Sequence, residues 1–235
     1  MCGILGFASD QVVKNCNKIL DGAELLNHRG PDDSGDWLSA DGRIGFAHRR
    51  LSIVDLTNRG RQPMTDFSNR FTIVFNGEIY NYPELFAKFS SKGYKFNSKT
   101  DTEVILAAYQ EWGEDCTSHL NGMFSFAIFD SINNTLFLSR DRAGEKPLFY
   151  GFNEGVLLFS SEIKAILASN LIKPKFYLPS AENLAAQSVS NRQGRGDVIK
   201  GEQAKEVLEL LKNDAERTYD NYEMMLNQRF DGTTI

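Results

Sequence analysis

The first 170 residues of the chain are dominated by short aromatic and β-branched segments that alternate with turn-forming residues. Such segments predict β-strands, because branched and aromatic side chains pack well on a pleated, half-buried surface. Two pairs of these segments are separated by only a few turn residues, so we expect two β-hairpins. The five predicted strands are residues 71–75, 123–129, 135–138, 148–150 and 156–159.

Helical periodicity occurs in fewer places. Apolar residues between positions 12 and 26 recur on one face at helical spacing. A second helix is predicted over residues 102–112, because Thr100 and Glu103 have the spacing of a capping box. A short helix is expected at residues 161–167. Together with the hairpins, these helices predict an α+β domain whose helices pack on antiparallel sheet.

The aromatic residues mark a domain boundary. Of the 17 phenylalanines, only Phe176 and Phe230 lie beyond Pro174, where the composition also changes. We therefore expect residues 1–173 to form one domain, since large apolar side chains supply most of a core. Residues 174–235 carry apolar residues at helical spacing and are expected to form a C-terminal helical extension. This extension either covers an apolar face of the domain or docks to a partner chain.

Charge and cysteine content exclude several classes of protein. The formal net charge of −5 argues against binding nucleic acid by charge alone. No apolar run approaches the ~20 residues of a membrane span, so no membrane association is expected. Three cysteines cannot form a disulfide scaffold, the N-terminus lacks a basic leader, and the histidines lack metal-ligand spacing. We therefore expect a cytoplasmic protein with no metal site.

Cys2 is the first candidate for catalysis. Initiator methionine is commonly removed before a small residue, and its removal would leave Cys2 with a free α-amine whose reference pKa is roughly 7.7–8.0. That amine can accept the proton of the thiol on its own residue, so nucleophile and base would share one residue. A cysteine at position 2 is otherwise an ordinary thiol. The interpretation therefore depends on the motifs elsewhere in the chain.

Six motifs follow one another in a recognisable order. They are MCGILGF at 1–7, HRGPDDSG at 28–35, HRRLSIVD at 48–55, NGEIYN at 76–81, TDTE at 100–103 and RDRAGEKPL at 140–148. This series resembles the glutaminase domain of the class II (N-terminal nucleophile) glutamine amidotransferases, and most of all the glutamine-hydrolysing asparagine synthetases. Sister families usually carry HRGYDSAG-like or HRGQDAAG-like segments instead of HRGPDDSG. The resemblance covers about residues 1–170.

The resemblance implies catalytic roles for the residues that match the family's motifs. Cys2 would attack the side-chain amide of glutamine. The side-chain amide of Asn76 and the backbone N–H of Gly77 would stabilise the oxyanion that this attack creates. Asn-Gly is also a strong signal for a tight turn, and the two interpretations are compatible, because a turn can direct backbone donors toward a site.

The resemblance also implies how glutamine is bound. Arg50, rather than Arg49, matches the arginine that binds the α-carboxylate, for which a guanidinium is well suited. Asp101 matches the acceptor for the α-ammonium, although a carboxylate in the first turn of a helix is favourable in itself by about 0.3–1 kcal/mol. The remaining predicted substrate-contacting residues are Leu51, Ser52, Ile53, Val54 and Glu78.

The fold implied by the resemblance is the αββα sandwich of N-terminal nucleophile hydrolases, with two antiparallel sheets between helix layers. The glutaminase reaction needs no cofactor. In the family, ATP and Mg are used by a synthetase domain with a Ser-Gly-Gly-x-Asp-Ser loop, and this sequence contains no such segment. The implied partners are therefore L-glutamine and a synthetase that receives ammonia, acting in trans or lost by truncation. A homodimer also remains open.

Three interpretations of function remain open from the sequence. The first is a glutamine-hydrolysing amidotransferase of the asparagine synthetase type. The second is a non-catalytic module that keeps the fold and binds glutamine or a synthetase. The third is another amidase with an N-terminal nucleophile, such as an acylase. Arg50 and Asp101 argue against the third, because together they suit a free amino acid. The final ammonia acceptor also remains open.

Overall fold

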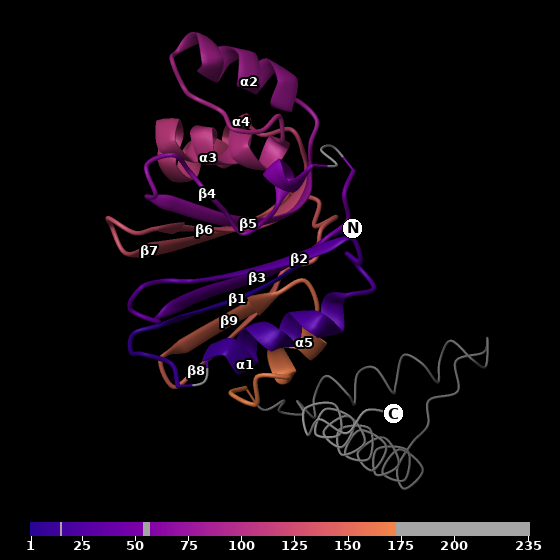
Figure 1. The fold of residues 1–235 in the computed structure, drawn as a ribbon, viewed down its shortest axis with the longest axis vertical. Helices are drawn as coiled ribbons and strands as arrows, with labels where there is room; N and C mark the ends of the chain where they lie inside the picture. The colour runs from indigo at the N-terminus through magenta and orange to yellow at the C-terminus, as the bar shows by residue number, and fades with distance from the viewer. Residues whose placement is uncertain (15, 54–56, 173–235) are drawn as a thin grey trace, which may run out of the picture. The chain divides into compact units, whose positions relative to one another are not determined.

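The computed structural model describes residues 1–14, 16–53 and 57–172, so the predicted extension at 174–235 lies outside the described residues. Two antiparallel sheets are stacked face to face, and helices pack on the outer face of each sheet (Figure 1). The predicted α+β sandwich of two antiparallel sheets between helix layers is therefore confirmed for the described part of the chain.

One sheet has five strands in the order β2-β3-β1-β9-β8 and the other has four in the order β4-β5-β6-β7. The first comprises β1 (Gly3–Ser9), β2 (Asp33–Leu38), β3 (Ile44–Arg50), β8 (Phe149–Asn153) and β9 (Val156–Ser160). The second comprises β4 (Met64–Thr65), β5 (Phe71–Ile79), β6 (Gly122–Asp130) and β7 (Thr135–Arg140).

The helices flank these two sheets on opposite sides (Figure 1). The layer beside β1 and β9 contains α1 (Cys16–Asp21), the 3₁₀ helix η1 (Gly22–Leu26) and α5 (Ile163–Leu167). The layer beside β5 and β6 contains α2 (Tyr82–Ser91), α3 (Asp101–Trp112) and α4 (Cys116–His119). Two further 3₁₀ turns, η2 (Asn58–Gly60) and η3 (Gly113–Asp115), connect these elements.

Alternation of side chains along the strands produces three apolar layers, because successive residues of a strand point to opposite faces. In β6, Phe126 and Ile128 pack against α3, while Ala127 and Phe129 face the other sheet. The layer between the sheets consists of Ile4, Ile44, Phe46, Val74, Ala127, Phe129 and Phe159. The sandwich is thus held by burial of apolar side chains on both faces of each sheet.

Both predicted hairpins are confirmed, as β6–β7 and β8–β9. The turn between β8 and β9 places Glu154 at φ 47° and Gly155 at φ 79°, which is the left-handed conformation that tight hairpin turns require. The helix predicted over residues 12–26 is shorter than expected, because α1 begins at Cys16 and gives way to η1 at Gly22.

The predicted turn at Asn76-Gly77 is wrong. Strand β5 continues to Ile79, with Asn76 opposite Ser125 and Gly77 opposite Phe124 in the neighbouring strand β6. Glycine is required here for a different reason, since a Cβ atom at Gly77 would lie 2.2 Å from the backbone oxygen of Met123. The close approach of two strands, rather than a turn, therefore explains the glycine.

Alternation along β3 separates its side chains into two sets. Phe46 packs in the layer between the sheets, and His48 spans that layer, because its Nε2 donates to the backbone oxygen of Phe75 at 3.2 Å. Ala47 instead packs with the helices on the outer face. Burial lowers the pKa of His48 to about 4, although the hydrogen bond to Phe75 opposes this shift. His48 is therefore neutral in the folded protein at pH 7.

We predict that His48 makes the free energy of unfolding fall as the pH is lowered from about 6.5 to about 4. The unfolded chain binds a proton at His48 near pH 6.5, while the folded chain does so only near pH 4. Stability is therefore present above pH 6.5 and lost as the pH approaches 4, by on the order of 3 kcal/mol.

Urea unfolding of the wild type and of His48→Gln at pH 7 and pH 4.5 checks this prediction, because glutamine still donates to Phe75 but does not titrate. His119→Gln, at an exposed histidine, is the matched control and should retain the wild-type pH dependence. Equal pH dependence in the wild type and His48→Gln would contradict the prediction.

Candidate active site

A pocket of about 130 Å³ lies between the residues that precede β1, the end of β3, β5 and the start of α3. Its lining includes eight predicted site residues from four separate segments of the sequence, namely Cys2, Arg50, Leu51, Ile53, Asn76, Gly77, Glu78 and Asp101. Of the other two predicted residues, Ser52 is not among the lining residues and its N–H donates to Asp32 Oδ2 at 2.8 Å. Val54 lies outside the described residues.

The thiol of Cys2 lies against the backbone of the segment that follows β3. The N–H of Leu51 donates to Cys2 Sγ at 3.4 Å, and the thiol donates to the backbone oxygen of Leu51 at 3.7 Å. Burial raises the pKa of the Cys2 thiol, and the contact with Leu51 and the charge of Arg50 only partly oppose this shift. A thiol in this position stays protonated at neutral pH and needs a base to become a nucleophile.

Asn76 projects from β5 on the same face as Val74, toward the layer between the sheets, because the two residues are two positions apart in one strand. Asn76 as a whole residue is 1% exposed. Neither Nδ2 nor Oδ1 hydrogen-bonds to another described residue. A buried amide without a partner is costly by about 1–3 kcal/mol, so it calls for an explanation.

Arg50 and Arg49 are adjacent in the sequence but point to opposite faces of β3. Arg50 lines the pocket, where its Nη1 donates to the backbone oxygen of Thr57 at 2.9 Å. Gly60 packs so closely on the Arg50 guanidinium that a Cβ there would lie 2.3 Å from Nη2. Arg49 instead donates to the backbone oxygen of Ala23 at 3.2 Å, on the helix side of the sheet. The structure thus brings Arg50, and not Arg49, into the pocket.

Asp101 occupies the first turn of α3, which Thr100 caps by accepting a hydrogen bond from the N–H of Glu103 at 3.4 Å. The Asp101 carboxylate accepts from the N–H of Ile79 at 3.1 Å and from that of Thr102 at 3.0 Å. Burial raises the pKa of Asp101 to about 6, and the charge of Glu78 adds to this shift. The pocket therefore holds a buried carboxylate that titrates close to neutral pH.

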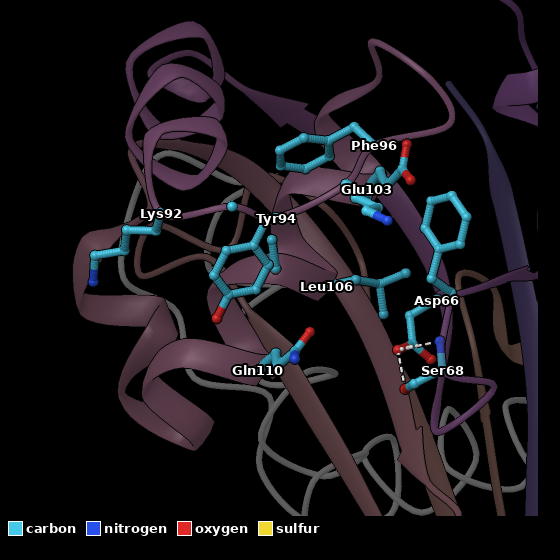
Figure 2. Close-up of a pocket in the computed structure, with 12 residues that line it drawn as sticks. Asp66, Ser68, Lys92, Tyr94, Phe96, Glu103, Leu106 and Gln110 are labelled. Atoms are coloured by element: carbon cyan, nitrogen blue, oxygen red, sulfur yellow. Dashed lines mark hydrogen bonds between the residues drawn. The ribbon is translucent and has the colours of Figure 1, made fainter.

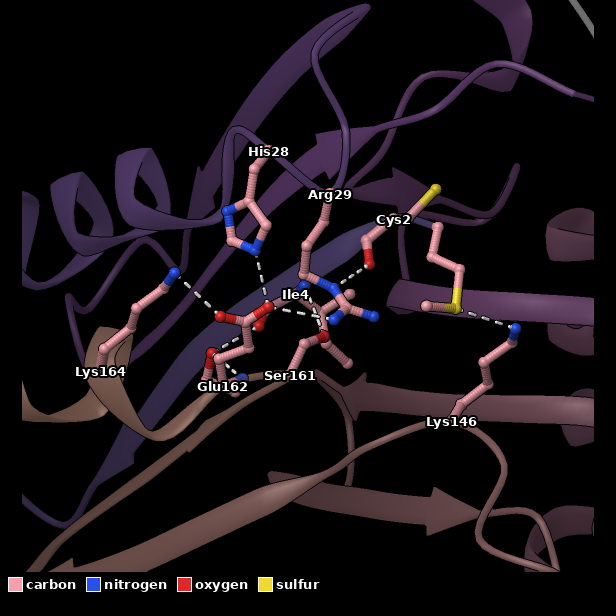
Figure 3. Close-up of polar contacts among 10 residues, drawn as sticks. Cys2, Ile4, His28, Arg29, Lys146, Ser161, Glu162 and Lys164 are labelled. Atoms are coloured by element: carbon pink, nitrogen blue, oxygen red, sulfur yellow. Dashed lines mark hydrogen bonds and ion pairs between the residues drawn. The ribbon is translucent and has the colours of Figure 1, made fainter.

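Several lining residues were not predicted from the sequence, and Lys146 is the most informative. It is 6% exposed, and its Nζ lies 3.4 Å from the thioether sulfur of Met1 (Figure 3). Asp141 accepts from the N–H of Lys146 at 2.9 Å and so holds the loop that carries this lysine. The motif at 140–148 marks the loop, but only the fold shows that it reaches the pocket. The other unpredicted lining residues are Met1, Gly60, Gln62, Phe75, Thr100, Thr102 and Met123.

A larger pocket, of about 330 Å³, lies beside α3 and the segment that follows α2 (Figure 2). None of its described lining residues is a predicted site residue. Its carboxylates already have partners, since Asp66 accepts from Ser68 and Glu103 accepts from the N–H of Asn97 at 2.8 Å and that of Ser98 at 2.7 Å. We therefore place the candidate active site at the smaller pocket.

Within residues 1–14, 16–53 and 57–172, no group of three or more His, Cys, Asp or Glu residues is placed to hold a metal ion. None of the helices in these ranges has the length and apolar character needed to cross a membrane.

Comparison with known proteins identifies close relatives. The chain is 41% identical over 205 residues to asparagine synthetase [glutamine-hydrolyzing] 3 of Bacillus subtilis, an alignment that covers 86% of this chain and 33% of that protein. It is 38% identical over 179 residues to asparagine synthetase [glutamine-hydrolyzing] 1 of the same organism, covering 72% of this chain and 27% of that protein. The chain thus spans a third or less of the length of these relatives.

A solved structure shares the fold. Glutamine phosphoribosylpyrophosphate amidotransferase from B. subtilis, complexed with ADP and GMP, superposes with a TM-score of 0.61 at 19% identity. The superposition covers 72% of this chain and 44% of that chain. A family model described as a glutamine amidotransferase domain matches residues 1–211, beyond the predicted boundary at Lys173. This match confirms the family predicted from the motifs: the chain belongs to the glutamine amidotransferase domain family.

Proposed function

We propose that the pocket hydrolyses the side-chain amide of L-glutamine to glutamate and ammonia, with Cys2 as the nucleophile. The observation that carries the proposal is the buried amide of Asn76, which has no hydrogen-bond partner among the described residues and lines the same pocket as Cys2. Donors aimed at a position where negative charge develops are the main requirement for acyl transfer. Asn76 and the N–H of Gly77 would supply them.

The charged residues of the pocket suit a free amino acid. A glutamine molecule carries an α-carboxylate and an α-ammonium group, and the pocket contains the guanidinium of Arg50 and the carboxylate of Asp101. We propose that Arg50 binds the α-carboxylate and Asp101 the α-ammonium, since each pairing is a charge-assisted hydrogen bond. Glu78 and the backbone of Leu51 and Ile53 would complete the wall around the substrate.

The proposed reaction begins when removal of Met1 frees the α-amine of Cys2. This amine accepts the thiol proton, and the thiolate attacks the amide carbon of glutamine to form a tetrahedral oxyanion, which accepts hydrogen bonds from Asn76 and Gly77. The amine then passes its proton to the departing nitrogen, the C–N bond breaks and ammonia leaves. Water hydrolyses the remaining thioester, which releases glutamate and regenerates the thiol.

We further propose that the ammonia is used by a synthetase that consumes ATP with Mg. Two relatives are named glutamine-hydrolysing asparagine synthetases and are at least three times as long as the matched part of this chain. Hydrolysis of glutamine at the pocket itself would require no cofactor, because nucleophile, base and oxyanion donors all belong to the chain.

Release of glutamate from glutamine by the purified chain tests the proposed function. Glutamine analogues that lack the α-amino or the α-carboxylate group are the controls, and we expect neither to be hydrolysed or to compete. Hydrolysis of simple acyl amides would favour another amidase. Tight binding of glutamine without hydrolysis, in protein shown by mass spectrometry to lack Met1, would favour a non-catalytic binding module.

We predict that kcat/KM for glutamine falls as the pH is lowered below about 6. Asp101 must be ionised to bind the α-ammonium group, and burial raises its pKa to about 6 in the free protein. Because kcat/KM reports ionisations of the free enzyme, protonation of Asp101 should add a further fall of about tenfold per pH unit below that value to the fall that protonation of the Cys2 α-amine, the proposed base, causes on its own. Steady-state glutamate release between pH 4.5 and pH 8 measures this profile.

Asp101→Asn should raise KM for glutamine about 10- to 100-fold, since loss of a charge-assisted hydrogen bond costs about 1.5–3 kcal/mol, and should remove the inflection near pH 6. The matched control is Asp115→Asn, at an exposed carboxylate outside the pocket, which should keep the wild-type profile. An unchanged inflection in Asp101→Asn would show that another group controls binding.

A further inference from the structure

Ser160, Ser161 and Glu162, where β9 ends and α5 begins, hydrogen-bond to the start of the chain, either directly or through Arg29. The hydroxyl of Ser160 and the N–H of Ser161 both donate to the backbone oxygen of Ile4 at 2.9 Å, and the N–H of Ile4 donates to Ser161 Oγ at 3.1 Å. The ladder between β1 and β9 begins only at Leu5. Through these contacts, hydrogen bonding between the end of β9 and the N-terminal segment reaches Ile4, one residue closer to Cys2 than the ladder does.

Glu162, the third of these residues, reaches Cys2 itself through Arg29. Arg29 Nη1 pairs with Glu162 Oε1 at 3.0 Å, and Arg29 Nε donates to the backbone oxygen of Cys2 at 3.0 Å (Figure 3). Cys2 precedes the first ladder pair of β1, which is Gly3 opposite Arg49. The guanidinium of Arg29 thus fixes the carbonyl of the residue on which the proposed nucleophile and base both lie.

The carboxylate of Glu162 is held in its ionised form. His28 Nε2 lies 2.9 Å from Oε1 and Lys164 Nζ lies 3.0 Å from Oε2. Burial alone would raise the pKa of Glu162, but the hydrogen bonds from Lys164, Arg29 and His28 outweigh burial and lower it to about 2. Arg29, whose side chain is 11% exposed, therefore has a partner that is ionised at neutral pH.

We propose that Glu162 is a positioning residue for Cys2, acting through Arg29 to orient the Cys2 carbonyl and hence its α-amine and thiol. The proposal rests on the proposed function of Cys2. Neither Glu162 nor Arg29 is among the described residues that line the pocket, so Glu162 has no direct route to the substrate there. Rotation of the peptide unit after Cys2 would displace both reacting groups, and a misplacement of about 1 Å can cost about 10²-fold in rate.

The chain contains a second pair of the same chemistry that serves as a matched control. Arg49 Nη2 lies 3.9 Å from Glu24 Oε1, and Arg49 Nε donates to the backbone oxygen of Ala23 at 3.2 Å. This arginine also bridges a carboxylate and a backbone carbonyl, but the carbonyl belongs to η1. If an arginine–carboxylate pair affected activity only by stabilising the fold, Glu24→Gln and Glu162→Gln would lower activity equally. A loss only in Glu162→Gln would instead point to its link with Cys2.

The test compares Glu162→Gln, Glu162→Asp and Glu24→Gln in the full chain. We expect Glu162→Gln to lower kcat for glutamine hydrolysis about 10- to 100-fold and to leave KM within about twofold, because Arg50 and Asp101 lie on other elements. Glu162→Asp should recover part of kcat, and Glu24→Gln should match the wild type. Alkylation of Cys2 by iodoacetamide, followed by mass spectrometry of the N-terminal peptide, should slow at least threefold in Glu162→Gln.

The proposal is overturned if Glu162→Gln has wild-type kcat and wild-type alkylation of Cys2, or if KM rises while kcat is unchanged. An equal loss in Glu24→Gln would also overturn it. If Glu162→Gln does not fold, kcat and Cys2 alkylation of Glu162→Asp are compared with those of the wild type and Glu24→Gln instead. Absence of glutamine hydrolysis by the wild type would contradict the proposed function instead, and the alkylation rates alone would then decide whether Glu162 positions Cys2.

Discussion

Cys2→Ala is expected to abolish release of glutamate from glutamine, by at least ~10⁴-fold in kcat, because no other thiol is among the described residues that line the pocket. Binding of glutamine should persist, since Arg50 and Asp101 do not depend on the thiol. Isothermal titration with glutamine measures the retained binding, and a coupled assay for glutamate measures the lost turnover. A variant that binds but does not hydrolyse separates a chemical role of Cys2 from a structural one.

The matched control is Cys16→Ala, because Cys16 packs on the helix side of the five-stranded sheet. This variant should have wild-type activity. Cys2→Ser is informative as well, since serine keeps a small second residue for removal of Met1 but offers a far less acidic nucleophile. Glutamate release by Cys2→Ala at the wild-type rate would exclude Cys2 as the nucleophile.

Asn76→Ala is expected to lower kcat for glutamine hydrolysis about 10²- to 10³-fold, which is the typical cost of removing one oxyanion donor. The KM for glutamine should change little, because the donor acts on charge that is present only in the transition state. The free energy of unfolding should fall by much less than the loss of kcat would suggest. Both amide atoms are already without partners among the described residues, so the substitution breaks no described hydrogen bond of this side chain.

Steady-state kinetics and urea unfolding of the same preparation check these two expectations together. Asn97→Ala, at an exposed asparagine outside the pocket, is the control and should retain wild-type kinetics. A large loss of stability in Asn76→Ala with little loss of kcat would show that the amide supports the packing of β5 rather than the reaction.

The strands that could be predicted from the sequence are those with an uninterrupted run of apolar residues next to a turn sequence. Residues 123–129 and 135–138 are apolar runs on either side of a turn cluster, and they form the hairpin β6–β7. Strands β1, β2 and β3 were not predicted from periodicity, because glycine, histidine and arginine interrupt their apolar residues. Of these residues only Arg50 lines the pocket, whereas Gly6 and Gly45 lie against the rings of Phe159 and Phe7. Close packing within the sheet, as well as the site, therefore overrides the pattern of a buried strand.

The sequence motifs identified most of the site, but they could not show how it is built. The turn expected at Asn76-Gly77 is a continuous strand, and the glycine is needed because β5 and β6 approach closely there. Lys146 and Gln62 enter the pocket from segments distant in the sequence, and no local pattern marks a residue for such a contact. Ser52 lies in a matching motif, but its backbone N–H donates to Asp32 and the residue does not line the pocket.

By itself, the sequence determined the family, the hairpins and the chemical types of the site residues, because these depend on residue identity and on spacing along the chain. The motif match also selected Arg50 over Arg49 for the site. Only the tertiary structure decided that Arg49 bonds to Ala23 on the helix side of the sheet, that Lys146 enters the pocket, and that Glu162 reaches Cys2 through Arg29. The packing of two sheets sets which strand faces meet, and burial in that layer shifts the pKa values of His48 and Asp101. These properties arise from contacts between residues far apart in the chain, which no local pattern encodes.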